Sequence, residues 1–207
     1  MLHLYCARVG EPMEDLPLSD YRKEKLCGIH NVQLRRQMLT AELLLNRAVK
    51  NVYPQISFPL HIEATKSGKP YLIEPPLFFN LSHSGDYVAC AIADFEIGLD
   101  IQNIRPVSMP LARRFFSKEE LRKLQASEHP DKVFTLLWSL RESYWKATGR
   151  GIAGDMNVAV YENETGFGIC GLPDIRFWTE EQDAFELALC SLNGQEPCPD
   201  RIESNVL

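Results

Sequence analysis

Residues 138–151 read Trp-Ser-Leu-Arg-Glu-Ser-Tyr-Trp-Lys-Ala-Thr-Gly-Arg-Gly and directly follow the apolar run 133–137. An apolar run that leads into two closely spaced glycines predicts a helix with a C-terminal stop. Trp138, Glu142 and Lys146 are spaced four apart, so they project from one side of that helix. A ring, a carboxylate and an ammonium on one face suit a buried ion pair or a site for an anionic ligand. The alternative is a solvated Glu–Lys pair, worth only about 0.2–0.5 kcal/mol.

The composition is that of an ordinary globular protein. The chain has 207 residues, of which 45% are hydrophobic and 24% charged, enough for one large domain or two small ones. A net charge of -6 argues against a general nucleic-acid binder, although it permits a local basic patch. The first residues alternate like a strand and lack the apolar core of a signal peptide, and no run approaches a membrane span. We therefore expect neither nucleic acid nor membrane among its partners.

The six cysteines show no C-x-x-C spacing and no zinc-finger rhythm. Several lie inside apolar runs, where a cysteine behaves as a small core residue. These observations predict reduced thiols and a cytoplasmic location.

The first part of the chain alternates between strand and helix patterns. Residues 2–9 predict a strand, and residues 18–50 predict a helical segment with Ser19 or Asp20 as N-cap. A core-facing stripe at helical spacing follows in that segment. Its members are Leu34, Met38, Ala41, Leu44, Leu45 and Ala48. Arg36 lies beside the stripe, where a solvated helix face is the simplest interpretation.

Residues 77–102 predict strands. The segments 87–93 and 97–102, joined by Asp94-Phe-Glu96, predict a strand–turn–strand hairpin. In the second segment the apolar side chains point one way, and Gly98, Asp100 and Gln102 point the other. Burying Asp100 would be costly without a cation or hydrogen-bond donors, and the alternative is an exposed edge-strand carboxylate.

The second half begins after two prolines. Ser117 followed by Glu120 predicts an N-cap with a capping box, which competes with any catalytic role for Glu120. Segments 157–161 and 185–192 predict further strands, and 193–207 a loosely held tail.

Three separated stretches together resemble the signature blocks of 4′-phosphopantetheinyl transferases, in the Sfp-like, pseudo-dimeric class. They are Phe79-Asn-Leu-Ser-His-Ser-Gly85, Ile97-Gly-Leu-Asp-Ile-Gln102, and Trp138–Lys146 with Gly149 and Gly151. A Gly68-Lys-Pro70 turn and a Phe115-Phe-Ser-Lys-Glu-Glu120 block stand where that family has equivalents. The resemblance covers about residues 20–192, with the blocks in the same order and with similar gaps.

The resemblance implies an α+β fold of two similar halves, each a small antiparallel sheet packed with a long helix and related by a pseudo-twofold. We expect these halves at residues 1–104 and 105–207, with the active site between them in a monomer. The implied enzyme is of the holo-[acyl-carrier-protein] synthase type. It moves the 4′-phosphopantetheine arm of coenzyme A onto a serine of an apo carrier protein, an acidic helical domain, and releases adenosine 3′,5′-bisphosphate.

The resemblance also implies a magnesium site. Asp100 and Glu142 match the family's carboxylate ligands, and Gln102 stands where a second strand acid is usual. The amide of Gln102 shares the face of Asp100, so it can ligate directly or through water. With one charge missing, we expect weaker magnesium binding than in a two-acid strand.

The coenzyme A contacts follow by position. Lys146 matches the lysine that reaches the phosphates, and His83, with Ser82 beside it, matches the histidine near the 3′-phosphate; a core histidine is the alternative. Lys69 matches a turn lysine near the adenosine end. The remaining basic matches are Lys25 and Arg36.

Glu120 matches a glutamate proposed in the family as general base, against the capping-box alternative, and Trp138 is assigned to packing. Two other classes of function stay open. One is a magnesium-dependent phosphohydrolase or nuclease that uses Asp100, Glu120 and Glu142. The other is a non-catalytic module that binds coenzyme A or a carrier protein.

Overall fold

The computed structural model describes residues 1–11, 15–154 and 158–203. The chain forms two compact units, Met1–Glu96 with the segment from Pro199 onward, and Ile97–Cys198. The boundary thus lies between Glu96 and Ile97, eight residues before the position expected from the sequence. Each unit combines a small, mainly antiparallel sheet with one long helix, as the resemblance implied.

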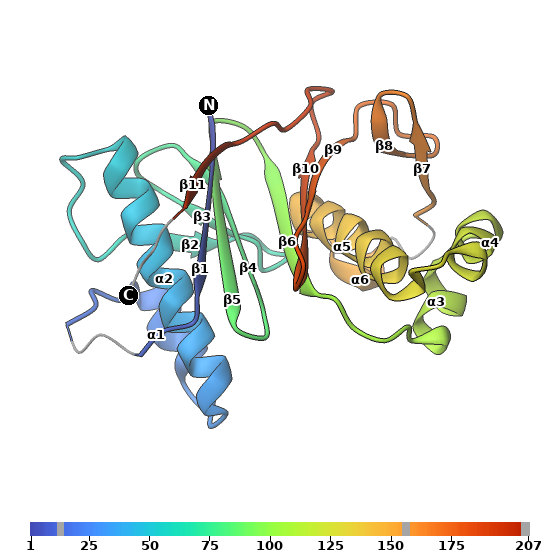
Figure 1. The fold of residues 1–207 in the computed structure, drawn as a ribbon. Coiled ribbons are helices and arrows are strands. Elements are labelled where there is room, and N and C mark those ends of the chain that lie inside the picture. The colour runs from blue at the N-terminus through green and yellow to red at the C-terminus, as the bar shows by residue number, and fades with distance from the viewer. Residues whose placement is uncertain (12–14, 155–157, 204–207) are drawn as a thin grey trace. The chain divides into compact units, whose positions relative to one another are not determined.

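The first unit contains a four-stranded sheet in the order β11-β1-β5-β4, with only the β11–β1 pair parallel. Helix α2 covers one face of this sheet (Figure 1). A short hairpin, β2–β3, completes the unit. The elements are β1 (Leu2–Arg8), α1 (Asp20–Leu26), α2 (Val32–Val52), β2 (Ile62–Ala64), β3 (Pro70–Leu72), β4 (Phe78–Ser84), β5 (Tyr87–Ala93) and β11 (Asp200–Glu203).

The helical segment expected over residues 18–50 is two helices. Ser19 is the N-cap of α1, as predicted, and its hydroxyl accepts a hydrogen bond from the Arg22 backbone N–H. The chain then passes through Gly28 at φ 79°, a left-handed conformation that ends a helix, and Asn31 caps α2. The predicted core stripe is buried along α2 except at Leu34, which is half-buried.

Two further expectations about strands are wrong. Strand β5 does not form a hairpin with β6 (Ile97–Asn103), because its two edges are already occupied by β1 and β4. Strand β6 pairs instead with β10 of the second unit. The predicted loose tail is also incorrect over Asp200–Glu203, which pairs with β1 as β11.

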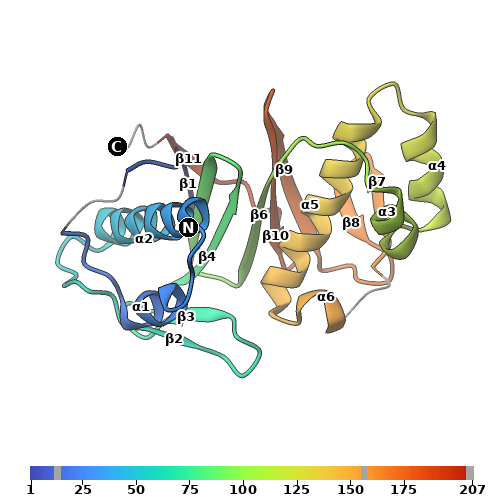
Figure 2. The same ribbon diagram turned by 90° about the horizontal axis from the view of Figure 1, so that it is seen from below.

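The second unit contains the sheet β6-β10-β9, with α5 packed against β6 and β10 (Figures 1 and 2). Helix α5 ends at Gly149, whose φ of 67° is the left-handed stop expected from the sequence. The predicted strand 185–192 is confirmed as β10, whereas β7 covers only part of the expected 157–161, and Asn157 lies outside the described residues. The remaining elements are α3 (Met109–Phe115), α4 (Lys118–Ala126), α5 (Pro130–Thr148), α6 (Gly151–Gly154), β7 (Val160–Asn163), β8 (Gly166–Ile169), β9 (Arg176–Glu181) and β10 (Phe185–Ser191).

Trp138 belongs to the core of the second unit. Its ring meets Phe115 edge-on at 5.5 Å between centroids and Trp145 at 6.0 Å, and it stacks on Phe134 at 6.5 Å. The side chain is 7% exposed. The assignment of Trp138 to packing is therefore confirmed.

Glu186 is a buried carboxylate on the sheet of the second unit. It is 2% exposed and lies between Gln102 of β6 and Glu181 of β9 in the strand register. Burial and the charge of Glu181 raise the pKa of Glu186 to about 7, against the opposing effect of Lys132. Because this carboxyl releases its proton more readily in the unfolded chain, its contribution to folding is fully present below pH 4.5 and is lost as the pH rises toward 7.

We therefore expect Glu186→Gln to raise the free energy of unfolding at pH 8 by about 1–3 kcal/mol. At pH 5 the gain falls to about a quarter of that value, because most of the penalty develops above this pH. Urea unfolding at the two pH values measures the difference. Glu128→Gln, the same change at an exposed position, is the control, and an equal gain at both pH values would contradict the prediction.

Candidate active site

Strand β6 approaches α5 closely at Gly98. A Cβ atom at this position would lie 1.9 Å from the backbone oxygen of Ser143 and 2.4 Å from the backbone nitrogen of Ala147. Only glycine allows this separation, because the atoms that would be hit belong to the helix backbone. The contact brings the Asp100 face of β6 against the part of α5 that carries Glu142 and Lys146.

Asp100 and Lys146 form an ion pair between β6 and α5. Lys146 Nζ donates to Asp100 Oδ1 at 2.6 Å, with the Asp100 side chain 2% exposed and the Lys146 side chain 29% exposed. Asp100 is therefore not an exposed edge-strand carboxylate. Lys146 therefore links α5 to β6. The alternative of a solvated Glu142–Lys146 pair within one helix does not describe this face.

Glu142 lies half-buried in the same region. Its pKa is raised, mainly by burial and then by the negative charge of Asp100, while Lys146 and Arg105 oppose the rise. The electrostatic effect of Asp100 places the two carboxylates close enough to repel each other. A cation between them would relieve that repulsion, so the pair is chemically suited to a hard divalent ion.

Gln102 occupies the next position on the Asp100 face. It is half-buried, and its cross-strand neighbour is Glu186. Across the described chain, no group of three or more His, Cys, Asp or Glu side chains is placed to hold a metal ion. Asp100, Glu142 and Gln102 offer two carboxylates and an amide, a set of oxygen donors that would fit Mg²⁺ if water and phosphate oxygens completed the octahedron.

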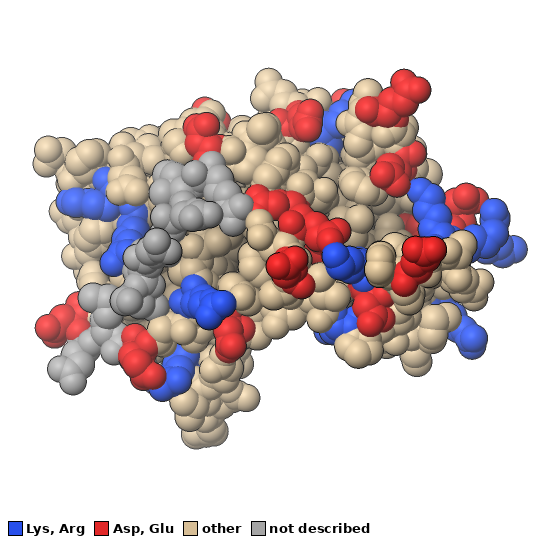
Figure 3. All heavy atoms as spheres, viewed as in Figure 1, with Lys and Arg blue, Asp and Glu red and all other residues tan. Residues whose placement is uncertain are grey.

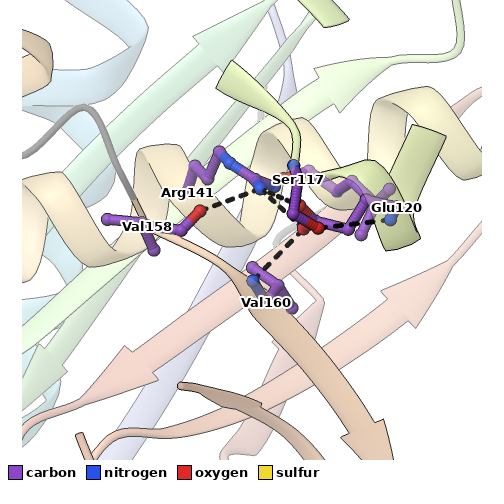
Figure 4. Close-up of polar contacts among 6 residues, drawn as sticks. Ser117, Glu120, Arg141, Val158 and Val160 are labelled. Atoms are coloured by element: carbon purple, nitrogen blue, oxygen red, sulfur yellow. Dashed lines mark hydrogen bonds and ion pairs between the residues drawn. The ribbon is translucent and has the colours of Figure 1, made fainter. Parts of the chain in front are cut away.

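Glu120 lies in a different set of contacts (Figure 4). The capping box is confirmed: Ser117 Oγ accepts from the Glu120 N–H at 3.2 Å, and Glu120 Oε2 accepts from the Ser117 N–H at 2.6 Å. Arg141 Nη2 donates to both Glu120 oxygens at 2.6 and 2.7 Å, and the Val160 N–H donates to Oε1 at 3.2 Å. Glu120 is 1% exposed. The general-base role stays a prediction, and these contacts favour the structural alternative.

The Ser82-His83 block lies in the first unit, on β4 at the edge of the sheet. His83 is exposed and Ser82 is buried, in agreement with their alternation along the strand. The alternative of a core histidine is therefore wrong, because His83 presents its ring at the surface of this unit.

Lys69, Lys25 and Arg36 also belong to the first unit. Lys69 borders a pocket of about 310 Å³ whose apolar wall includes Tyr71 and Phe78. Lys25 is exposed, with its ammonium 5.5 Å from the Tyr21 ring centroid. Arg36 Nη2 donates to both carboxylate oxygens of Glu11 at 2.7 Å, so this guanidinium already has an acidic partner.

Basic side chains are available despite the negative net charge. On the face shown in Figure 3, Lys and Arg side chains are interspersed with Asp and Glu side chains. Arg141 is a further residue of this region that the motifs did not single out; it is fully buried and adjacent to Glu142. The sequence does contain an indication of this role. Arg141 lies among apolar residues in the Trp138–Lys146 stretch, and an arginine that is buried there needs a buried acidic partner.

Comparisons with known proteins agree with the motifs. The family model described as the 4′-phosphopantetheinyl transferase superfamily matches residues 96–190, and the model of the N-terminal part of 4′-phosphopantetheinyl transferase matches residues 18–94. The chain is 36% identical to 4′-phosphopantetheinyl transferase psf-1 of Bacillus pumilus over 143 residues, which are 67% of this chain and 61% of that protein.

Two relatives are matched over most of their length. A 4′-phosphopantetheinyl transferase of Bacillus subtilis is 30% identical over 84% of this chain and 82% of its own. The transferase Sfp of Bacillus subtilis strain 168 is 29% identical over 87% of this chain and 84% of its own. A holo-[acyl-carrier-protein] synthase of Thermotoga maritima shows a TM-score of 0.42 and 20% identity over 48% of this chain and 64% of its own. The chain belongs to the 4′-phosphopantetheinyl transferase family, which confirms the resemblance seen in the motifs.

Gly98→Ala should separate β6 from α5, because the added methyl group overlaps helix backbone that cannot rotate away. We expect a loss of about 3 kcal/mol or more in the free energy of unfolding, measured by urea denaturation. Cys190→Ala, directly opposite on β10, removes atoms from the same layer and should cost no more than about 1–2 kcal/mol. A Gly98→Ala protein as stable as the wild type would contradict the close approach.

Proposed function

We propose that the protein transfers 4′-phosphopantetheine from coenzyme A to a serine of an apo carrier protein, in a magnesium-dependent reaction that releases adenosine 3′,5′-bisphosphate. The observation that carries the proposal is the grouping of Asp100, Glu142 and Lys146 where β6 meets α5. Two carboxylates and an ammonium match the needs of a reaction in which pyrophosphate charge must be neutralised.

Asp100 and Glu142 would hold the metal, with Gln102 as a direct or water-mediated ligand. Magnesium, when bound, supplies charge neutralisation at the pyrophosphate. Lys146 pairs with Asp100 and reaches the same region from the helix, so we assign it to the phosphates and to the departing nucleotide. The half-buried setting strengthens these charge interactions relative to open water.

The first unit would supply the other coenzyme A contacts. The exposed ring of His83 with Ser82 beside it is assigned to the 3′-phosphate region, and Lys69 to the adenosine end. The pocket next to Lys69 offers an apolar wall with a cation at its border, which suits an aromatic base that carries phosphates. Lys25 is assigned to the same anionic ligand, and so is Arg36, which would exchange Glu11 for a phosphate.

The hydrolase alternative requires Asp100, Glu120 and Glu142 to act as one cluster. The described residues contain no such cluster, and Glu120 is bound to Arg141 instead. This arrangement favours transfer over hydrolysis. The non-catalytic alternative rests on Gln102 alone, and the grouping of Asp100, Glu142 and Lys146 counts against it.

We propose that the protein works as a monomer in the cytoplasm on an acidic, helical carrier domain. All six cysteines are free thiols, which suits a reducing compartment. None of the described helices is long and apolar enough to cross a membrane. The similarity to Sfp over most of its length favours a transferase of the Sfp type over one of the holo-[acyl-carrier-protein] synthase type.

The test is to incubate the protein with coenzyme A, Mg²⁺ and an apo acyl carrier protein and to read the mass of the carrier. We expect the carrier to gain one phosphopantetheine, and Glu142→Gln to reduce the rate roughly 100-fold or more by removing a metal ligand. Glu128→Gln, on the exposed surface, should leave the rate unchanged. Near-normal turnover by Glu142→Gln would remove this residue from the metal site.

Gln102→Glu should tighten the apparent affinity for Mg²⁺ in the presence of coenzyme A, roughly 3- to 10-fold, because it adds a charged ligand on the Asp100 face. Calorimetric titration of Mg²⁺ measures the change. Asn103→Asp adds the same charge on the opposite face of β6 and should have little effect. An unchanged or weaker affinity for Gln102→Glu would mean that position 102 does not face the metal.

A further inference from the structure

In each unit a buried ion pair joins a short N-capped helix to the long helix. In the first unit Arg22 Nε of α1 lies 3.2 Å from Glu42 Oε2 of α2. In the second unit Arg141 Nη2 of α5 lies 2.6 Å from Glu120 Oε1 of α4. The polarity is reversed, since the acid lies on the long helix in the first unit and on the short helix in the second.

The two pairs occupy corresponding positions. Arg22 and Glu120 are each the third residue after a serine N-cap, Ser19 or Ser117, and each backbone N–H donates to the serine hydroxyl at 3.2 Å. The partners on the long helices follow 20 and 21 residues later in the sequence. The same helix–helix junction is therefore built twice with opposite charges.

The carboxylate of each pair also binds the backbone N–H of the N-cap serine. Ser19 N–H donates to Glu42 Oε1 at 2.8 Å, across the two helices. Ser117 N–H donates to Glu120 Oε2 at 2.6 Å, within one helix. The N–H of the N-cap serine is thus bound by a carboxylate on the long helix in one unit and on the short helix in the other. The junction itself therefore does not require the acid to lie on a particular helix.

In the second unit this pair lies on α5, next to the candidate site. Arg141 is fully buried, lies over the Phe116 ring at 4.6 Å, and donates to the backbone oxygens of Leu137 and Val158 at 2.9 Å. Figure 4 shows Arg141 between the Glu120 carboxylate and the backbone oxygen of Val158. Arg141 immediately precedes Glu142, so the contacts that hold its side chain also constrain the part of α5 that carries Glu142 and Lys146.

The Glu120 carboxylate is poorly placed to take a proton from an incoming serine. Both oxygens accept two hydrogen bonds each, from Arg141 and from the backbone N–H groups of Ser117 and Val160. The residue is 1% exposed. A general base must come within hydrogen-bond reach of the proton that it removes, and this one is enclosed by donors.

We propose that Glu120 and Arg141 are positioning residues: their ion pair sets the rotation of α5 so that Glu142 and Lys146 face Asp100, and Glu120 is not the general base. The proposal rests on the function assigned above to Glu142 and Lys146. It predicts that the junction works with either polarity, as the first unit demonstrates.

The decisive variant exchanges the charges, Glu120→Arg together with Arg141→Glu. The carboxylate then lies on the long helix, from which it can accept the Ser117 N–H as Glu42 accepts the Ser19 N–H. Urea unfolding, calorimetry of Mg²⁺ with coenzyme A, and the pH profile of kcat are measured for the wild type, Glu120→Gln and the exchanged pair. The exchange Arg22→Glu with Glu42→Arg tests, by stability alone, whether the first unit accepts the reverse polarity.

We expect Glu120→Gln to lose stability and to bind Mg²⁺ with coenzyme A at least roughly 10-fold more weakly, because it leaves a buried arginine without its charge partner. The exchanged pair should recover affinity and kcat to within roughly 10-fold of the wild type, with the pH profile unchanged. Arginine cannot act as a base at these pH values, so recovery is incompatible with base catalysis by Glu120.

The proposal is overturned if the exchanged pair folds and binds Mg²⁺ with coenzyme A normally but transfers roughly 100-fold more slowly, with the acidic limb of the pH profile lost. If the exchanged pair does not fold, Glu120→Gln with Arg141→Met replaces it as an uncharged pair and is judged by the same criteria. If the wild type transfers nothing to any carrier, the proposed function fails. The positioning role is then still decided by whether binding falls in Glu120→Gln and returns in the paired variant.

Discussion

The contact between β6 and α5 at Gly98 is the constraint on which the candidate site depends. A side chain there would collide with the helix backbone, so the strand carries none and lies directly on the helix. This close approach lets a lysine of α5 reach a nearly buried aspartate of β6 at 2.6 Å. With any larger residue at position 98, Asp100 would be buried without its cation or would move into solvent, and both outcomes remove the grouping.

The charges around α5 are divided between two sides of the helix. Lys146 pairs with Asp100 of β6, whose charge also raises the pKa of Glu142, and Arg141 pairs with Glu120 of α4. Because these charges are largely buried, leaving either ion pair unmade would be costly, so α5 is held at a defined rotation. In the Asp100–Lys146 pair the lysine side chain stays 29% exposed. The nearby Glu142 carboxyl has a raised pKa, which is typical of a group that a bound ligand would stabilise. The Arg141 pair is enclosed by the protein: both Glu120 oxygens and both terminal nitrogens of the guanidinium are hydrogen-bonded within the chain.

Gln102 illustrates how a site residue is affected by its neighbours on the sheet. The position faces Glu186, whose pKa is already raised to about 7 by burial and by Glu181. A neutral amide at 102 avoids a further negative charge in that row of side chains. The neutral side chain at position 102 thus limits the repulsion between carboxylates across β6, β10 and β9.

The sequence by itself determined the local elements and the family. Alternation on β6 assigned Asp100 and Gln102 to one face, the serine with its glutamate predicted the capping box, and Gly149 predicted the end of α5, because each depends on residues near in sequence. Only the tertiary structure decided which strands pair and which charges meet. Strand β5 had no free edge for β6, the tail found an edge beside β1, and Glu120 found Arg141, since partners 21 or more residues apart are selected by packing that no local pattern records.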